Sequence, residues 1–185
     1  FEAGYRDDAV EIFQYVYETA QKEFGESDPF TLEVLFNLTD HLTDAGDWRL
    51  AVHYGQKGVL LCSQQFGVGH VRTLDMMNTL ASAQRNDPLS YQDALELDQK
   101  VYEGYYRLFG RLSPEAISAR GVISLDYDLM GLLDKAIRNQ EETVEDWKEA
   151  SDLDDERSWT SLNNLSYLYG KKGLWLKSVE TDWLA

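Results

Sequence analysis

The chain has 185 residues and a hydrophobic content of 43%, so it can bury a sizeable core and is not a disordered tail. Its formal charge of −16 repels phosphate backbones and anionic headgroups, which argues against nucleic acid and membranes as partners, although solubility alone would explain such a charge. No signal peptide or membrane-spanning stretch is visible, and Cys62 alone cannot form an internal disulfide, so we expect a cytoplasmic protein.

Two helical patterns alternate along the chain. In the first, apolar residues recur at the spacing of an amphipathic helix. These stripes are Leu32, Leu35, Leu38 and Leu42; Leu74, Met77 and Leu80; Ile117, Ile123 and Tyr127; and Trp159, Leu162, Leu165 and Tyr169. In chain order we expect a second helix alone in residues 1–27, complete helix pairs in 28–69, 70–112 and 113–154, and a partial pair in 155–185.

Turn and capping residues indicate where these helices begin and end. Asp28-Pro29 and Ser113-Pro114 place a capping side chain before a proline at the first helical position, where the missing N–H costs nothing. The pair in residues 70–112 has Asn86–Ser90 in place of a glycine turn. Elsewhere the turns contain Gly46, Gly131 and Gly173, and the second helices open at Trp48, Tyr91, Leu133 and Trp175 and close at Phe24-Gly25, Phe66-Gly67 and Phe109-Gly110.

The same residue types return at a constant step. Small residues of the second helix are spaced by 42, 43, 42 and 42 positions, and they are Ala9, Ala51, Ala94, Ala136 and Ser178. The first helix carries a matching small column of Thr39, Ala81, Ser124 and Ser166. Facing small columns let helices approach closely, so a leucine at Ala94 or Ala136 would overpack the contact. We therefore predict an all-α fold, an α-solenoid of antiparallel helix pairs.

Ser161–Gly173 and the junctions Gly25–Thr31 and Gly67–Thr73 carry a family likeness. The unit resembles the tetratricopeptide repeat (TPR), in the 42-residue variant found in kinesin light chains. Similar repeats form the sensor arrays of larger fungal nucleotide-binding receptors. Neither end of the sequence has the polar cap that a solenoid end needs, so we expect a fragment of a longer protein or ends covered by another chain, which would allow self-association.

The resemblance implies that the first helices line a concave, peptide-binding groove. Asparagine suits such a groove because its amide both donates to and accepts from a peptide backbone, although it also bonds often to its own helix. The groove residues implied by the register are Glu33, Phe36, Asn37, Asp40, Asp75, Asn78, Ser82, Arg85, Asn163, Asn164, Tyr167 and Lys171.

The charges of these positions indicate what the groove accepts. Only Arg85 and Lys171, near the helix ends, are basic, so neither the carboxylate clamp of chaperone-tail-binding repeats nor the basic groove of kinesin light chains carries over. Carboxylates lie at one end of the groove, at Glu33, Asp40 and Asp75. We expect a protein or peptide partner that is neutral or basic there rather than acidic.

Other motifs indicate no cofactor, metal or catalysis. His41, His53 and His70 lack the spacing of a zinc site, and no phosphate loop or nucleophile elbow occurs. We interpret the aromatic run that ends at Phe109 as core positions, and likewise Trp147 within its acidic segment. We expect a non-enzymatic interaction scaffold; the alternative is a structural, self-associating spacer or sensor array within a signalling protein.

Overall fold

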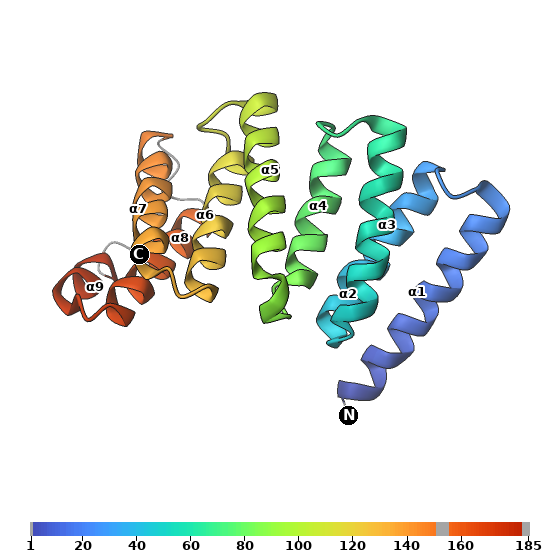
Figure 1. The fold of residues 1–185 in the computed structure, drawn as a ribbon, viewed down its shortest axis with the longest axis horizontal. Helices are drawn as coiled ribbons and strands as arrows, with labels where there is room; N and C mark the ends of the chain where they lie inside the picture. The colour runs from blue at the N-terminus through green and yellow to red at the C-terminus, as the bar shows by residue number, and fades with distance from the viewer. Residues whose placement is uncertain (1, 151–155, 183–185) are drawn as a thin grey trace. The chain divides into compact units, whose positions relative to one another are not determined.

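The computed structural model describes the backbone of residues 2–150 and 156–182 and the side chains of 10–150 and 156–181. All regular structure in these ranges is helical (Figure 1), which confirms the predicted all-α class. The helices are α1 (Glu2–Phe24), α2 (Pro29–Ala45), α3 (Trp48–Phe66), α4 (Val71–Gln84), the short 3-10 helix η1 (Pro88–Ser90), α5 (Tyr91–Phe109), α6 (Pro114–Leu129), α7 (Leu133–Glu149), α8 (Glu156–Lys171) and α9 (Trp175–Asp182). None of them is long and apolar enough to cross a membrane.

The helix boundaries follow the predicted turn and capping residues. α3, α5, α7 and α9 begin at the predicted Trp48, Tyr91, Leu133 and Trp175, and α1, α3 and α5 end at the predicted phenylalanines. The Asp28 carboxylate accepts a hydrogen bond from the Phe30 N–H at 2.9 Å, and the Ser113 hydroxyl accepts one from Ala116 N–H at 3.2 Å. Gly46 ends α2 with φ 88°, a left-handed backbone that favours glycine.

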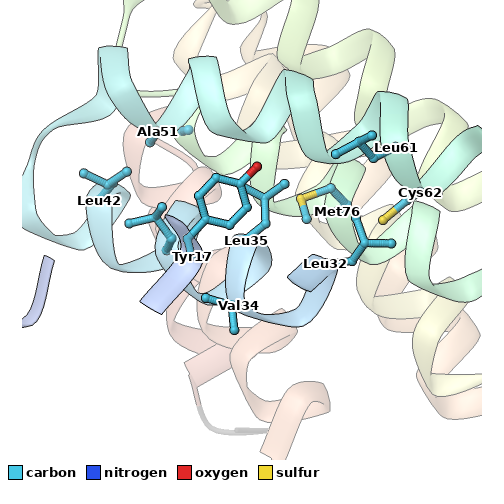
Figure 2. Close-up of a cluster of buried hydrophobic side chains, with 11 residues drawn as sticks. Tyr17, Leu32, Val34, Leu35, Leu42, Ala51, Leu61, Cys62 and Met76 are labelled. Carbon is cyan, nitrogen blue, oxygen red and sulfur yellow. The ribbon is translucent and has the colours of Figure 1, made fainter. Parts of the chain in front are cut away.

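The chain forms two compact units, unit 1 (Phe1–Leu97) and unit 2 (Asp98–Ala185). The core of unit 1 joins four helices: Tyr17 comes from α1, Leu35 from α2, Ala51 from α3 and Met76 from α4 (Figure 2). The Leu35, Leu38 and Leu42 side chains of the predicted stripe are fully buried. The amphipathic face of α2 therefore packs between its neighbours, as a stacked repeat requires.

The core of unit 2 combines apolar packing with buried hydrogen bonds. Apolar side chains of α7 pack against α8. Ser161 on α8 ties the two helices together, because its carbonyl accepts a hydrogen bond from Gln140 at 2.9 Å and its hydroxyl accepts one from the Trp147 indole at 3.1 Å. Trp147 is 1% exposed, as its predicted core position requires. The apolar cluster consists of Ala136, Ile137, Val144, Leu162, Leu165, Leu168 and Tyr169.

The small columns lie where the helices meet. Thr39, Ala51, Ala81, Ala94, Ser124 and Ala136 are buried to 2% exposure or less. In the last pair the Ser166 and Ser178 hydroxyl oxygens lie 3.0 Å apart, which places the two columns in direct contact. The side chain of Ala9, the boundary between residues 154 and 155, and residues 183–185 lie outside the described parts of the chain.

The expectation that Phe109 is a core residue is wrong, and Phe24, at the equivalent helix end, is exposed as well. Phe24 is 61% exposed and Phe109 is 51% exposed. Each is the last residue of its helix, so it stacks on a nearby ring at the surface instead of entering the core. Phe24 meets Phe30 edge-on with ring centroids 5.8 Å apart, and Phe109 stacks on Tyr105 at 6.1 Å.

Candidate functional site

The first helices of neighbouring pairs contact each other and form one face in each unit. In unit 1, α2 contacts α4, and in unit 2, α6 contacts α8. We call these surfaces the first-helix faces. All twelve groove residues named from the sequence are exposed or half-buried, and none is enclosed in a core.

A pocket of about 340 Å³ lies on the first-helix face of unit 1. Three of the residues named from the sequence, Glu33, Phe36 and Asp75, line it. The buried side chains of Leu32, Cys62 and Met76 add an apolar part to the lining, and Arg72 is its one basic residue. Asn37, Asp40, Asn78 and Ser82 lie on the same helices and Arg85 caps the end of α4, but none of these residues lines the pocket.

The polar groups of the unit 1 pocket carry more negative than positive charge. Glu33 and Asp75 bring two carboxylates against the single guanidinium of Arg72. That guanidinium lies over the Phe66 ring, 5.5 Å from its centroid. Burial raises the pKa of the Cys62 thiol, so the lining sulfur is a neutral thiol at neutral pH. The pocket therefore combines an apolar part with net negative charge.

A second pocket, of about 160 Å³, lies on the first-helix face of unit 2. Asn164 and Tyr167 from the predicted set line it. Asn163 is exposed on the same helix, and Lys171 is exposed beside the pocket. The remaining lining residues are Gly121, Ser124, Leu125, Asp128, Gln140 and Leu168.

Lys171 is paired within the protein. Its ammonium lies 2.7 and 2.9 Å from the two carboxylate oxygens of Asp128 and 5.6 Å from the centroid of the Tyr167 ring. The hydrogen bond to Asp128 raises the pKa of Lys171, so the ammonium is charged at neutral pH. This positive charge, which the sequence suggested for the groove, is largely offset by its neighbour.

The asparagine amides are open to a ligand. Within the described residues, the side chains of Asn37, Asn78, Asn163 and Asn164 form no hydrogen bond. Thr79, which stands 42 positions after Asn37, is buried, and its hydroxyl donates to the Asp75 carbonyl at 3.2 Å. This threonine is hydrogen-bonded to its own helix, whereas the four asparagine side chains are not.

Sequence reasoning missed several residues that shape these faces. Gln140 lies on a second helix and still reaches the unit 2 pocket, and Arg72 belongs to the first turn of α4. His70 caps α4, because its Nδ1 accepts a hydrogen bond from the Arg72 N–H at 3.2 Å. The histidine occupies the place that Asp28 and Ser113 hold in other repeats, which is the one signal that could have identified it as a cap.

A buried ion-pair cluster lies in unit 2. Asp146 on α7 pairs with Arg111, and Arg120 lies 2.9 Å from its carboxylate. The Arg120 guanidinium also donates to the Tyr102 hydroxyl at 2.7 Å. Burial raises the pKa of Asp146, and the two arginines oppose that shift. The cluster links α5, α6 and α7, and we interpret its role as structural. No group of three or more potential metal ligands occurs among the residues that the structure describes.

Comparisons with known proteins identify the fold. Neither a protein-family model nor a curated protein matches the sequence. A Podosopora anserina structure described as a kinesin light chain with nearly identical TPR-like repeats matches with a TM-score of 0.83 and 18% identity, over 99% of this chain and 86% of the other. BtubC (BKLC) from P. vanneervenii matches with a TM-score of 0.75 and 16% identity, over 97% of this chain and 71% of the other.

The apo form of RapI also matches, with a TM-score of 0.74 and 15% identity, and this chain covers 47% of its length. At such identities the likeness concerns the fold, and the matches cover almost all of this chain. The 42-residue step and the helix ends agree with the same fold. The chain is therefore an α-solenoid of the TPR type, similar in fold to kinesin light chain repeats.

Proposed function

We propose that this chain is a non-enzymatic protein-interaction scaffold that binds a peptide or protein segment along its first-helix faces, and that residues 1–27, 28–69, 70–112, 113–154 and 155–185 are the successive segments of one array. The observation that carries the proposal is the pair of pockets, each on a first-helix face. Asn164, whose amide has no partner in the described residues, lines the unit 2 pocket, and Asn37 and Asn78 lie on the two first helices that form the unit 1 pocket. Concave, largely apolar pockets with a few polar groups are typical of ligand sites.

Charge favours a ligand that is neutral or basic at unit 1. Glu33 and Asp75 line the unit 1 pocket, and Asp40 is exposed on the same helix. An acidic ligand would meet these carboxylates, whereas the aliphatic part of a lysine or arginine would fit the apolar part of the lining. The overall charge of −16 also favours a protein partner over nucleic acid or an anionic membrane. The compartment that we propose for this interaction is the cytoplasm.

Binding to peptide libraries tests this proposal. A basic and an acidic library of otherwise matched composition are titrated against the chain, and the basic set is expected to bind more tightly as the salt concentration falls. Asn37→Ala and Asn164→Ala each remove one backbone-binding amide and are expected to weaken binding about fivefold, or about 1 kcal/mol.

The matched controls are Gln56→Ala and Gln99→Ala, exposed amides on the second helices α3 and α5. They are expected to leave affinity unchanged. Tighter binding of the acidic library, or equal losses in the controls, would refute a groove on the first-helix faces.

A self-associating spacer is the second candidate. Val179 on α9 is 54% exposed, whereas Ile137, which holds the same position one repeat earlier, is 7% exposed. Trp175 on the same helix is 69% exposed, so α9 presents an apolar surface that another helix could cover. Light scattering over a range of concentrations separates the two candidates, because only the spacer predicts a mass that rises with concentration and falls in Val179→Asp.

A further inference from the structure

The polar lining of the unit 2 pocket indicates which ligand group it accepts. Apolar walls come from Leu125, Tyr167 and Leu168, and hydrogen-bonding groups come from Gln140 and Asn164. The Ser124 hydroxyl already accepts a hydrogen bond from Asn139, at 2.9 Å. The pocket therefore offers one carboxamide on each of two helices, α7 and α8.

Gln140 holds an acceptor that lacks a donor. The residue is fully buried, and its Nε2 donates to the Ser161 carbonyl at 2.9 Å, which sets the orientation of the amide. Its Oε1 accepts no hydrogen bond from any described residue. A buried acceptor without a donor is destabilising, so a ligand that brings an N–H group to this oxygen gains an interaction that the free protein lacks.

The charges beside the pocket disfavour an ionised ligand group. The Asp128 carboxylate, which lines the pocket, is already paired with Lys171. The opposite charges of this pair largely cancel, so an incoming cation or anion gains too little attraction here to offset the loss of its own hydration. An uncharged group that carries an N–H donor has less hydration to lose.

We propose that the unit 2 pocket binds the uncharged carboxamide of an asparagine or glutamine side chain in the peptide ligand. The ligand amide donates to Gln140 Oε1, and its oxygen accepts from the amide of Asn164. The pocket volume of about 160 Å³ is close to the roughly 150 Å³ that holds a benzene molecule in an engineered cavity, which suits a carboxamide with its methylene groups. Because the Gln140 oxygen is covered, binding requires neighbouring lining side chains to move as the ligand enters. This subsite rests on the proposed peptide-binding function.

The test begins with peptides selected from a random display library on the whole chain. The proposal expects enrichment of asparagine or glutamine at one position. Replacing that residue by methionine, which resembles glutamine in length but lacks the amide, is expected to weaken binding about tenfold, which corresponds to about 1.4 kcal/mol. Against Gln140→Met the difference between the two peptides is expected to shrink below about threefold.

A second variant tests the position of the pocket. Gly121→Phe copies Phe36, which stands at the equivalent position of unit 1, and is expected to weaken the same peptide at least tenfold by filling the pocket. A Cβ atom at Gly121 would lie 3.5 Å from Thr143 Cγ2, an ordinary contact. The melting temperature of Gly121→Ala is therefore expected to be no lower than that of the unaltered chain, which shows that this position tolerates a side chain.

The outcomes separate this subsite from the proposed function. Equal affinity for the glutamine and methionine peptides, or enrichment of charged residues in place of amides, would show that Gln140 meets only water and would overturn the subsite. Peptides that respond to Asn37→Ala but not to Gly121→Phe would place the ligand in unit 1 alone; the subsite then fails and the proposed function stands. If the library yields no bound peptide, both fail.

Discussion

In units 1 and 2, different residue types bring a second helix into contact with the first helix that follows it. Gly55 and Gly58 on α3 stand at the positions that Gln140 and Thr143 occupy on α7. A Cβ atom at Gly55 would lie 3.0 Å from Leu80 Cδ1, and one at Gly58 would lie 2.6 Å from Met76. Unit 1 thus brings α3 and α4 together by omitting side chains, whereas unit 2 joins α7 to α8 through the hydrogen bond from Gln140 to Ser161.

This difference extends to the ligand-accepting faces. The close approach in unit 1 brings Met76 into the lining of a pocket of about 340 Å³ with two carboxylates. The polar contact in unit 2 leaves a pocket of about 160 Å³ with an amide in its lining. A constant repeat therefore determines where helices meet, and the residue at the contact determines what the nearby surface can bind.

Gly55→Gln breaks the comparison most severely, because it places the unit 2 residue into unit 1. The new side chain would collide with Leu80 and Thr39 and bury an amide without partners, so we expect a loss of about 3 kcal/mol in the free energy of unfolding. Urea denaturation measures it, with the exposed neighbour substitution Gln56→Met as control. A loss no larger than the control's would show that α3 and α4 do not pack as closely as described.

Ala136→Leu tests the small column that both units share. Ala136 is fully buried on α7, and the added atoms are expected to overpack the contact by about 2 kcal/mol. Arg138→Leu, at an exposed position of the same helix, introduces the same residue without overpacking. Melting curves of the two variants should separate by several degrees, and coincident curves would contradict the repeat register.

Gln140→Met sharpens the comparison by removing the polar contact while nearly keeping side-chain volume. Loss of the hydrogen bond to the Ser161 carbonyl is expected to cost about 1 kcal/mol, partly recovered because the oxygen that lacks a donor also disappears. Chemical denaturation gives the value. A gain in stability would mean that the buried amide is retained at a net cost in unit 2, which would fit a role in binding better than a role in folding.

The smallest expected effect concerns the surface ion pair of unit 1. The Lys57 ammonium lies 2.8 Å from a Glu26 carboxylate oxygen and lowers the pKa of Glu26. A lowered folded-state pKa stabilises the fold at neutral pH, and this contribution is lost as the pH falls through the lowered pKa. Glu26→Gln should lower the melting temperature slightly at neutral pH, and the gap should close in acid and in high salt. A gap that is independent of pH would exclude the ion pair as its cause.

Much of the fold could be predicted because its signals are local and repeated. Turn glycines, caps such as Asp28 and Ser113, and the leucine stripe of α2 each act within one or two helical turns, so a single sequence displays them. Phe109 was wrongly predicted to be buried. It is the last residue of its helix, and a side chain at a helix end can stay at the surface even where the repeat pattern assigns it to the buried face.

The face of the candidate site could be predicted, but the pockets could not. The register places Asn37 and Asn164 on first helices, and their exposure follows from the amphipathic pattern. The contribution of Gln140 depends on how closely α7 approaches α8. Lys171 and Asp128, which pair with each other, are 43 residues apart in the sequence. Such contacts arise from packing between repeats and leave no mark in the local pattern.

Amide chemical-shift mapping of the whole chain with a library-selected peptide tests the central claim most directly. The account predicts that saturable shifts concentrate on α2 and α4 around Phe36 and Asp75 and on α6 and α8 around Gly121 and Asn164, with the second helices largely unaffected apart from the pocket-lining Cys62 and Gln140. Shifts confined to the exposed surfaces of α3 and α7, or to α9, would contradict a ligand site on the first-helix faces.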